Sequence, residues 1–397
     1  MPGFEIFGDE ERKEVNDVLS TGVLFRYGFP QARNNHWKAK SFETEFAEYM
    51  NIEHCLLVSS GTSALTTALT AMGIGANDEV IVPPFTFVAT VEAVIACGAI
   101  PIFADIDDTL CLSAEAVEKK ITDKTKAVIV VHMCGSMAQI DKLQSLCKSK
   151  NLFLIEDSCQ AIGADFNGKK IGTFGDVGCF SFDSVKTITC GEGGAIITNN
   201  QEIYLKSDAI SDHGHDHIGD DRGKEGHAII GMNYRISELN AAVGLAQLRK
   251  INTILELQRK NQSALESVLN KYDFITLRNV PDKNGDSATF LSFYTQTEAQ
   301  ARNLTSILQK NGFDGVFYWF DNNWHYIKKW EHITNLLSAN KLHIHSNSNL
   351  PDYNNLDLSI SDDLISRLIS IQIKISWTEE ELYRRIGLLD KSLAELK

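Results

Sequence analysis

Short apolar runs alternate with stretches of helical periodicity over the first part of the chain. Runs of four or five mostly apolar residues at 55–58, 79–82, 101–104, 127–131 and 152–156 predict buried strands. Between them, segments 86–97, 114–120 and 140–149 carry apolar residues at helical spacing. Strands that alternate with helices indicate βαβ units and a mainly parallel sheet. The pattern therefore predicts an α/β fold.

Helical patterns also flank this region. Segments 9–21 and 38–50 predict two helices before the first strand, and the second carries its aromatic residues at core spacing. A further pattern begins near Ser237 and continues to about Leu269, which predicts one long helix that bridges domains or supports a dimer interface.

The pattern changes near residue 270. Short strands are predicted at 274–277 and 289–295, a strand or turn at 316–320, a loop at 342–359, a helix followed by a strand at 364–376, and helices at 299–309 and 378–395. This order is typical of an α+β unit. We therefore predict a large α/β domain over residues 1–250 and a smaller α+β domain over residues 251–397.

Composition and charge narrow the classes of function. The chain has 397 residues and a net charge of −14, which argues against a nucleic-acid partner. It has no apolar run of about 18 residues, so no membrane span is expected. The first residues are acidic and mixed, and the eight cysteines are scattered without a CxxC pair. These features predict a cytoplasmic protein with reduced thiols and no metal site.

An anion-binding turn is predicted after the first strand. Ser60-Gly61-Thr62-Ser63 separates that strand from a helix rich in Ala and Leu. Free N–H groups and the helix dipole at such an N-terminus attract anions. The alternative is an ordinary N-cap by Ser60 or Thr62.

Two neighbouring carboxylates close the strand at 152–156. Alternation along a strand places Glu156 and Asp157 on opposite faces, so only one can face a ligand. Buried carboxylates are rare unless they are paired, and a protonated pyridine nitrogen is a suitable partner for Asp157. The alternative is that Asp157 caps the next turn.

Lys186 lies in an unusual setting. Ser181 precedes it by five positions, and a Gly-x-Gly-Gly cluster follows at 191–194. Small residues let a flat cofactor approach, and a desolvated lysine loses its proton more easily, as a Schiff-base lysine for pyridoxal phosphate requires. The alternative is a β-hairpin with an exposed lysine. A polar segment at 199–231 carries four histidines without metal-ligand spacing, which favours an active-site or interface loop.

Six motifs then occur in one order. They are Ser-Gly-Thr-Ser-Ala-Leu (60–65), Pro-Phe-Thr-Phe-Val-Ala-Thr (84–90), Glu-Asp-Ser-Cys-Gln-Ala-Ile-Gly-Ala (156–164), Phe-Ser-Phe-x3-Lys (180–186), Gly-Glu-Gly-Gly-Ala (191–195), and the stretch from Asn-Tyr-Arg-Ile-Ser-Glu to Ala-Gln-Leu (233–248). Over residues 20–260 the chain closely resembles the sugar aminotransferases of the DegT/StrS family. The resemblance implies a fold type I aminotransferase that uses pyridoxal 5'-phosphate.

The resemblance also implies roles for single residues. Lys186 would form the Schiff base with the cofactor and then carry the proton between substrate and cofactor. Asp157 would pair with the pyridine nitrogen, Gln160 would lie near the 3-hydroxyl, and Phe87 would stack on the ring.

The resemblance assigns the phosphate contacts to other residues. Thr62, Ser63 and Ser181 would hold the phosphate, and Asn233 would reach the phosphate of a neighbouring subunit. A homodimer with shared active sites is therefore expected.

The activity that the resemblance implies is transfer of an amino group from L-glutamate to a keto- or aldo-sugar. Related sugar dehydratases have His where this chain has Lys186, which favours amino transfer over dehydration. The tail lacks the family's Pro- and His-rich ending and resembles the branch that aminates C8 of an oxidised 3-deoxy-octulosonate (Kdo) for lipopolysaccharide. A nucleotide-linked keto-sugar is the alternative acceptor, and Lys328, Lys329, Arg367 and Lys374 would suit either anion. A sensor protein on the same fold is the non-enzyme alternative.

Overall fold

A computed structural model describes residues 3–218, 222–348 and 350–396. Its large sheet has seven strands in the order β1-β9-β8-β5-β4-β2-β3. Only β9 is antiparallel to its neighbours, so the sheet is mainly parallel, as predicted. Its strands are β1 (His54–Val58), β2 (Glu79–Val82), β3 (Ile100–Phe103), β4 (Thr125–Val131), β5 (Phe153–Asp157), β8 (Val177–Ser181) and β9 (Gly194–Thr198).

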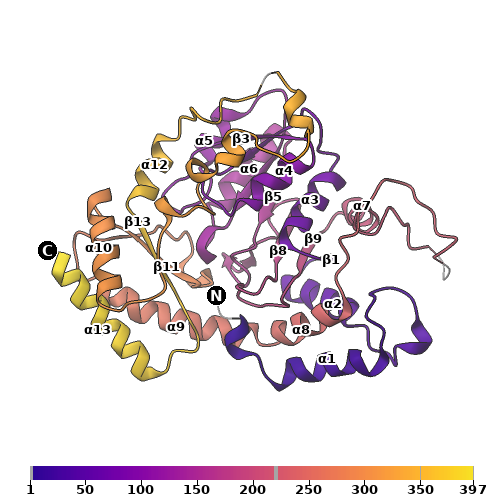
Figure 1. Ribbon diagram of the computed structural model, residues 1–397, viewed down its shortest axis with the longest axis horizontal. Helices are drawn as coiled ribbons and strands as arrows, with labels where there is room; N and C mark the ends of the chain where they lie inside the picture. Colours follow the sequence, from indigo (N-terminus) through magenta and orange to yellow (C-terminus); the bar gives the residue numbers. More distant parts are fainter. Residues whose placement is uncertain (1–2, 219–221, 349, 397) are drawn as a thin grey trace.

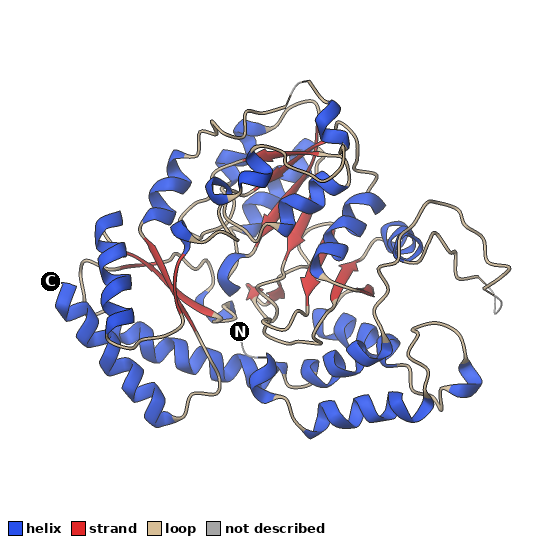
Figure 2. Cartoon of the chain, viewed as in Figure 1, coloured by secondary structure: helices blue, strands red, loops and turns tan. Residues whose placement is uncertain are grey.

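Helices flank this sheet (Figure 2). From the start of the chain to residue 269, the helices are α1 (Asp9–Thr21), α2 (Lys38–Met50), α3 (Gly61–Ala71), α4 (Ala89–Ala96), α5 (Ala114–Lys120), α6 (Ile140–Lys150), α7 (Gln201–Ser211), α8 (Glu238–Leu248) and α9 (Ile251–Leu269). On one face of the sheet, Phe42 and Phe46 of α2 pack against Phe180 and Phe182. The strands are thus buried on both sides, which explains why they read as continuous apolar runs.

A second, antiparallel sheet has the order β10-β11-β13-β12 and lies beside α10 and α13 (Figure 1). Its apolar core draws on residues from Leu265 to Leu393. Its elements are β10 (Thr276–Leu277), β11 (Phe290–Tyr294), β12 (Val316–Tyr318), β13 (Leu368–Gln372), α10 (Glu298–Lys310), α11 (Glu331–Thr334), α12 (Ser359–Ser366) and α13 (Glu379–Leu396). We call this region the small domain; its boundary at residue 250 stays a prediction.

Short elements complete the chain. A two-stranded hairpin consists of β6 (Asp165–Phe166) and β7 (Lys169–Lys170). The 3-10 turns are η1 (Gly3–Ile6), η2 (Pro30–Ala32), η3 (Met133–Gly135), η4 (Lys283–Gly285), η5 (Trp319–Asp321), η6 (Ile327–Lys329) and η7 (His343–Ser346). No described helix is both long and apolar enough to cross a membrane.

One prediction about a helix was wrong. The stretch expected to form one long helix breaks into α8 and α9 at Arg249 and Lys250. There the Lys250 ammonium binds the Glu11 carboxylate and the Ile6 carbonyl, which are contacts that periodicity does not report. Residues 364–376 were expected to form a helix followed by a strand, and the structure has this order: α12 ends at Ser366 and β13 begins at Leu368.

Candidate active site

The N-terminus of α3 faces the loop that follows β8. The Ser60 hydroxyl accepts a hydrogen bond from the Ser63 amide (3.0 Å), and the Ser63 hydroxyl binds the Ser60 amide (2.8 Å). Ser60 is therefore the N-cap, and the exposed Thr62 is left to face solvent or a ligand. A Cβ on Gly61 would lie 2.8 Å from the Ser181 Cβ and 3.0 Å from the Cys159 sulfur, so Gly61 permits this close approach.

These contacts form a site suited to an anion. The amides at the start of α3 are free of side-chain caps except for that of Ser63, and the helix dipole is positive there. Ser181 is 9% exposed, and its hydroxyl accepts a hydrogen bond from the Asp183 amide (3.3 Å). The predicted residues Thr62, Ser63 and Ser181 are thus brought together around one helix end.

The two neighbouring carboxylates have different surroundings. Glu156 is fully buried and accepts hydrogen bonds from three backbone amides and from His132, at 2.6 to 3.0 Å. Asp157, which is 4% exposed, accepts hydrogen bonds from the Thr90 hydroxyl (2.8 Å) and the Cys159 amide (3.2 Å). Glu156 is therefore saturated by the fold, whereas Asp157 keeps acceptor capacity for a ligand.

Gln160 is oriented by one backbone contact. Its Oε1 accepts a hydrogen bond from the Cys134 amide (3.0 Å), and the side chain is 6% exposed. Because the carbonyl oxygen is engaged in this way, the amide nitrogen remains as the donor. A phenolate-type oxygen is a suitable acceptor for that group.

Lys186 lies on the turn between β8 and β9, half-buried, with its amide donating to the Asp183 carbonyl (3.0 Å). Its charge acts on two neighbours. Burial and the Asp157 carboxylate raise the pKa of the Cys159 thiol, and the Lys186 ammonium opposes this rise. Burial and the same ammonium lower the pKa of His325 to about 4. Lys186 therefore lies close to the residues around Asp157 and to the small domain.

His325 belongs to a small-domain segment, 322–327, that sequence reasoning did not assign to the site. The Thr86 amide donates to the His325 carbonyl (3.0 Å), and the Val88 amide donates to the Trp324 carbonyl (3.1 Å). The Phe87 ring lies 5.6 Å from the His325 ring and stacks on Trp324 at 5.9 Å. The motif Trp-His-Tyr was visible in the sequence, but no local signal connects it with Phe87.

Residues 6–384 match the DegT/DnrJ/EryC1/StrS aminotransferase family. This chain belongs to that family. It is 40% identical to a GDP-perosamine synthase of Vibrio cholerae over 79% of both chains. It is also 37% identical to an L-glutamine:2-deoxy-scyllo-inosose aminotransferase of Streptomyces kanamyceticus, over 68% of this chain and 65% of the relative.

Solved structures agree with this result. An aminotransferase of Psychrobacter cryohalolentis superposes with a TM-score of 0.83 at 26% identity and 98% coverage of both chains. A 3-amino-5-hydroxybenzoic acid synthase gives 0.80 at 27% identity, covering 98% of this chain and 97% of that one. The predicted fold type I architecture, the aminotransferase class and the pyridoxal-phosphate cofactor are therefore confirmed, and the chain is a sugar aminotransferase.

The residues present in this aminotransferase fit that cofactor. The turn at Gly61 leaves no room for a Cβ, and the free backbone amides at this helix N-terminus can donate hydrogen bonds to a phosphate. Asp157 offers a buried carboxylate with spare acceptor capacity, and Gln160 offers a free amide donor. The individual roles of these residues, including the stacking role of Phe87, stay predictions.

Asn233 is the predicted site residue that the chain does not bring to this cluster. It is exposed and pairs with Asp212, at the base of a segment that projects from α7 (Figure 1). Burial raises the pKa of Asp212, but hydrogen bonds from Arg222 and His217 outweigh burial and hold that pKa below its usual range.

The histidines of this projecting segment are engaged with one another and with carboxylates. His217 lies between Asp208 (2.6 Å) and Asp212 (3.0 Å), and its ring stacks on Tyr27. The His215 and His227 rings lie 4.2 Å apart. Over the described ranges, no group of three or more His, Cys, Asp or Glu side chains is arranged to hold a metal ion.

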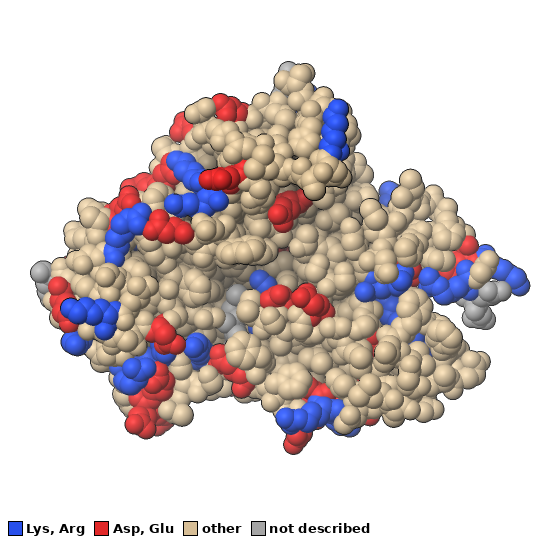
Figure 3. Space-filling model, in the orientation of Figure 1, with Lys and Arg blue, Asp and Glu red and all other residues tan. Residues whose placement is uncertain are grey.

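The four cationic residues expected to suit an anionic substrate are all paired with aspartates. Figure 3 shows acidic and basic side chains interspersed over the left of the molecule, where the small domain lies. The pairs are Lys328 with Asp362, Lys329 with Asp321 (3.6 Å), Arg367 with Asp363 (2.5 Å) and Lys374 with Asp314 (3.2 Å). They form ion pairs within the small domain rather than a free anion site.

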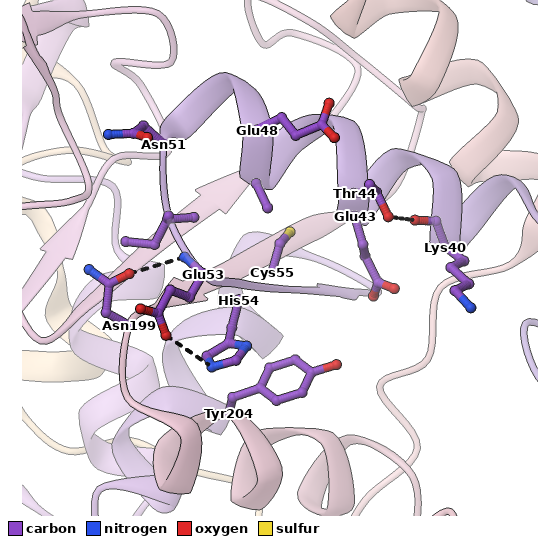
Figure 4. A pocket seen from close by; sticks show the side chains of 12 residues that line it. Lys40, Glu43, Thr44, Glu48, Asn51, Glu53, His54, Cys55, Asn199 and Tyr204 are labelled. Atoms are coloured by element: carbon purple, nitrogen blue, oxygen red, sulfur yellow. Dashed lines mark hydrogen bonds and ion pairs between the residues drawn. The ribbon is translucent and has the colours of Figure 1, made fainter.

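A cavity of about 740 Å³ lies at the N-terminal end of β1, which is the end away from α3 (Figure 4). It is lined from α2, β1 and α7, with the His54 ring stacked on Tyr204 at 4.8 Å. None of the predicted site residues lines it. The predicted cofactor-contact residues therefore lie away from this cavity, and those of α3 follow the opposite end of β1.

Proposed function

We propose that this aminotransferase moves an amino group from L-glutamate to the carbonyl of a compact sugar acid, 8-oxo-3-deoxy-octulosonate. The arrangement of Lys186, Asp157 and the α3 N-terminus carries the proposal for amino transfer. The acceptor is argued from the small domain. L-glutamine, which appears in the name of a relative, is the alternative donor.

Two features of the small domain support an acceptor without a nucleotide. Segment 322–327 is hydrogen-bonded to the loop around Phe87, so aromatic side chains close one side of the site. The nucleoside diphosphate of a nucleotide-linked sugar carries two or more negative charges, which need cationic partners. The cationic residues of the tail are already paired with aspartates. A sugar acid with one carboxylate makes a smaller demand for free cations.

The second candidate is a nucleotide-linked keto-sugar. The specific observation in its favour is the 40% identity to a GDP-perosamine synthase over 79% of this chain. Amination of a GDP-linked 4-keto sugar with a higher kcat/KM than that of 8-oxo-3-deoxy-octulosonate would overturn the first choice of acceptor.

The chain's own residues divide the chemistry among them. When bound, pyridoxal phosphate supplies an electron sink for the substrate carbon. Asp157 would hold a proton on the ring nitrogen by accepting its hydrogen bond. The Lys186 amine would take the proton from the substrate carbon and carry it to the cofactor. Gln160 donates to the ring oxygen, and the amides of α3 with Ser181 hold the phosphate.

Lys186→Ala tests the assignment of the lysine. The variant should lose the absorbance band of the lysine-bound cofactor near the visible edge, together with amino transfer from L-glutamate. Lys206→Ala, on a surface lysine paired with Glu202 (2.7 Å), is the matched control and should keep both. Retention of the band in the Lys186 variant would contradict the proposal.

The proposal includes a homodimer with shared active sites. Its support is the projecting segment, where Ile218, Ile230 and Met232 are 75%, 93% and 53% exposed next to Asn233. Apolar side chains at such exposure favour contact with another chain. Mixing Lys186→Ala with Asn233→Ala after reversible dissociation should restore activity, because one site of each mixed dimer then carries neither change. No restoration, together with a monomeric sedimentation coefficient, would refute the shared site.

A further inference from the structure

The N-terminal turn η1 (Gly3–Ile6) lies against the loop that carries Lys186. The Gly3 amide donates a hydrogen bond to the Lys186 carbonyl (3.1 Å), and Gly3 is buried. In Figure 1 the first described residues, in indigo, lie near the middle of the molecule, between the two sheets. A segment more than 180 residues away in sequence therefore touches the lysine's own backbone.

Gly3 is required there by close approach. A Cβ at this position would lie 2.9 Å from the Lys186 oxygen and 2.9 Å from the Thr189 nitrogen. Cβ atoms do not come this close to backbone atoms, so a larger residue must push either η1 or the lysine loop away. The contact is therefore tight against the backbone at Lys186 and at Thr189, three residues after it.

The same turn is fixed to the small domain by Glu5. The Glu5 Oε2 atom accepts hydrogen bonds from the Ile375 amide (2.9 Å) and the Ser376 amide (2.8 Å), which lie between β13 and α13. A carboxylate that accepts two amides makes charge-assisted hydrogen bonds, which are stronger than neutral ones.

The large domain holds the other end of the turn. The Lys250 ammonium donates to the Ile6 carbonyl (3.1 Å) and also binds the Glu11 carboxylate (2.8 Å). The turn therefore spans three parts of the molecule: the lysine loop, the small domain and the start of α9.

We propose that Gly3 and Glu5 are positioning residues, and that η1 couples the position of the small domain to the position of Lys186. The proposal rests on the proposed function only for the role of Lys186 in amino transfer. Fixing the lysine carbonyl fixes the origin of its side chain, and a misplacement of about 1 Å at a reacting group costs about 10²-fold in rate. Any movement of residues 375–376 is passed to the lysine loop through Glu5.

The experiment compares Gly3→Ala and Glu5→Gln with two matched controls. Gly387→Ala is the glycine control, because nothing lies within 4 Å of a Cβ there, and Glu380→Gln is the control for loss of a carboxylate from the exposed start of α13. The first measurement is amide hydrogen exchange of the peptide over residues 183–190 in the cofactor-free protein. Both test variants should exchange about tenfold faster in this peptide, on the scale of one lost hydrogen bond, while the controls match the wild type.

The second measurement is steady-state amino transfer. Both test variants should lower kcat by about tenfold with little change in the KM for L-glutamate, because the lysine and not the donor contact is displaced. Unchanged exchange in both test variants overturns the inference, and so does equal acceleration in the controls. A wild-type protein without amino transfer would refute the proposed function, while the exchange measurement would still decide the role of η1.

Discussion

Adjacent carboxylates at the end of β5 give a sharp prediction, because Glu156 and Asp157 should respond in opposite ways to removal of their charge. We expect Glu156→Gln to lose stability, and Asp157→Asn to keep stability and lose amino transfer. Both changes remove one negative charge and preserve side-chain size. Any difference between them must therefore come from the contacts that each carboxylate makes.

The magnitude for Glu156 follows from its four donors. Gly172 and His132 donate to one oxygen, and Phe174 and Gly175 donate to the other, each at 3.0 Å or less. His132 accepts from an amide at Nδ1, so its Nε2 carries the proton and is a donor. The NH₂ of glutamine would therefore face two donors in either orientation. Hydrogen bonds to a charged group contribute about 1.5–3 kcal/mol each, so we expect a loss of about 3–5 kcal/mol.

Asp157→Asn should cost less stability than Glu156→Gln, because Asp157 accepts fewer hydrogen bonds. The Thr90 hydroxyl can rotate to accept from the amide of asparagine, and the Cys159 amide keeps an oxygen acceptor, so the loss of stability should stay near 1 kcal/mol. Amino transfer should fall by about 10²-fold or more, as for other preorganised electrostatic contacts.

Two assays separate the variants. Denaturant unfolding of the cofactor-free proteins gives the stability, and single-turnover amino transfer from L-glutamate gives the rate. A stable but inactive Glu156→Gln variant, or an Asp157→Asn variant that unfolds and keeps its activity when folded, would refute the assignment of the two carboxylates.

Three further predictions concern packing and pH. Gly244→Ala should lose about 1–3 kcal/mol in thermal unfolding from overpacking, because its Cβ would lie 2.3 Å from the Phe42 ring, whereas Gly387→Ala should gain slightly from helix propensity. Burial lowers the pKa of His217, but Asp208 and Asp212 outweigh burial and raise that pKa. The stability that His217 contributes is therefore complete below its ordinary pKa of 6.5 and is lost as pH rises through the raised pKa. His217→Asn should flatten this decline of the unfolding midpoint. The pKa of His325 is lowered to about 4, so folding stability should fall as pH drops from 6.5 towards 4. His325→Phe should remove this loss of stability at acid pH. An unchanged dependence of the unfolding midpoint on pH in either variant would contradict the assigned titration.

Much of the large domain could be predicted from the sequence because its strands are buried on both faces and read as separate apolar runs. The same locality explains two expectations about residues near the predicted site. Ser60 caps α3 within one turn, and the alternation of Glu156 and Asp157 is a property of one strand. Each of these inferences used contacts between residues fewer than ten positions apart.

The break between α8 and α9 could not be predicted in this way. The apolar pattern continues through Arg249 and Lys250, so periodicity favours one helix. At the break, the Lys250 ammonium contacts Glu11 and Ile6, which lie more than 230 residues away in the sequence. Periodicity carries no information about such tertiary contacts, and helix boundaries are the least certain part of a prediction from sequence.

The same distinction divides the active site. The residues that motifs identified lie on the large domain, and Thr62, Ser63 and Ser181 gather around one helix end, where local rules apply. His325 lies in the small domain and accepts a backbone hydrogen bond from Thr86, and η1 at the start of the chain donates one to the backbone of Lys186. Backbone contacts leave little trace in side-chain identity, apart from a glycine such as Gly3 where the approach is close. In the inference drawn for η1, the position of Lys186 depends on Gly3 and Glu5, whose sequence gives almost no sign of that role. Variants at these two residues therefore test the position of the lysine more directly than further changes within the motifs.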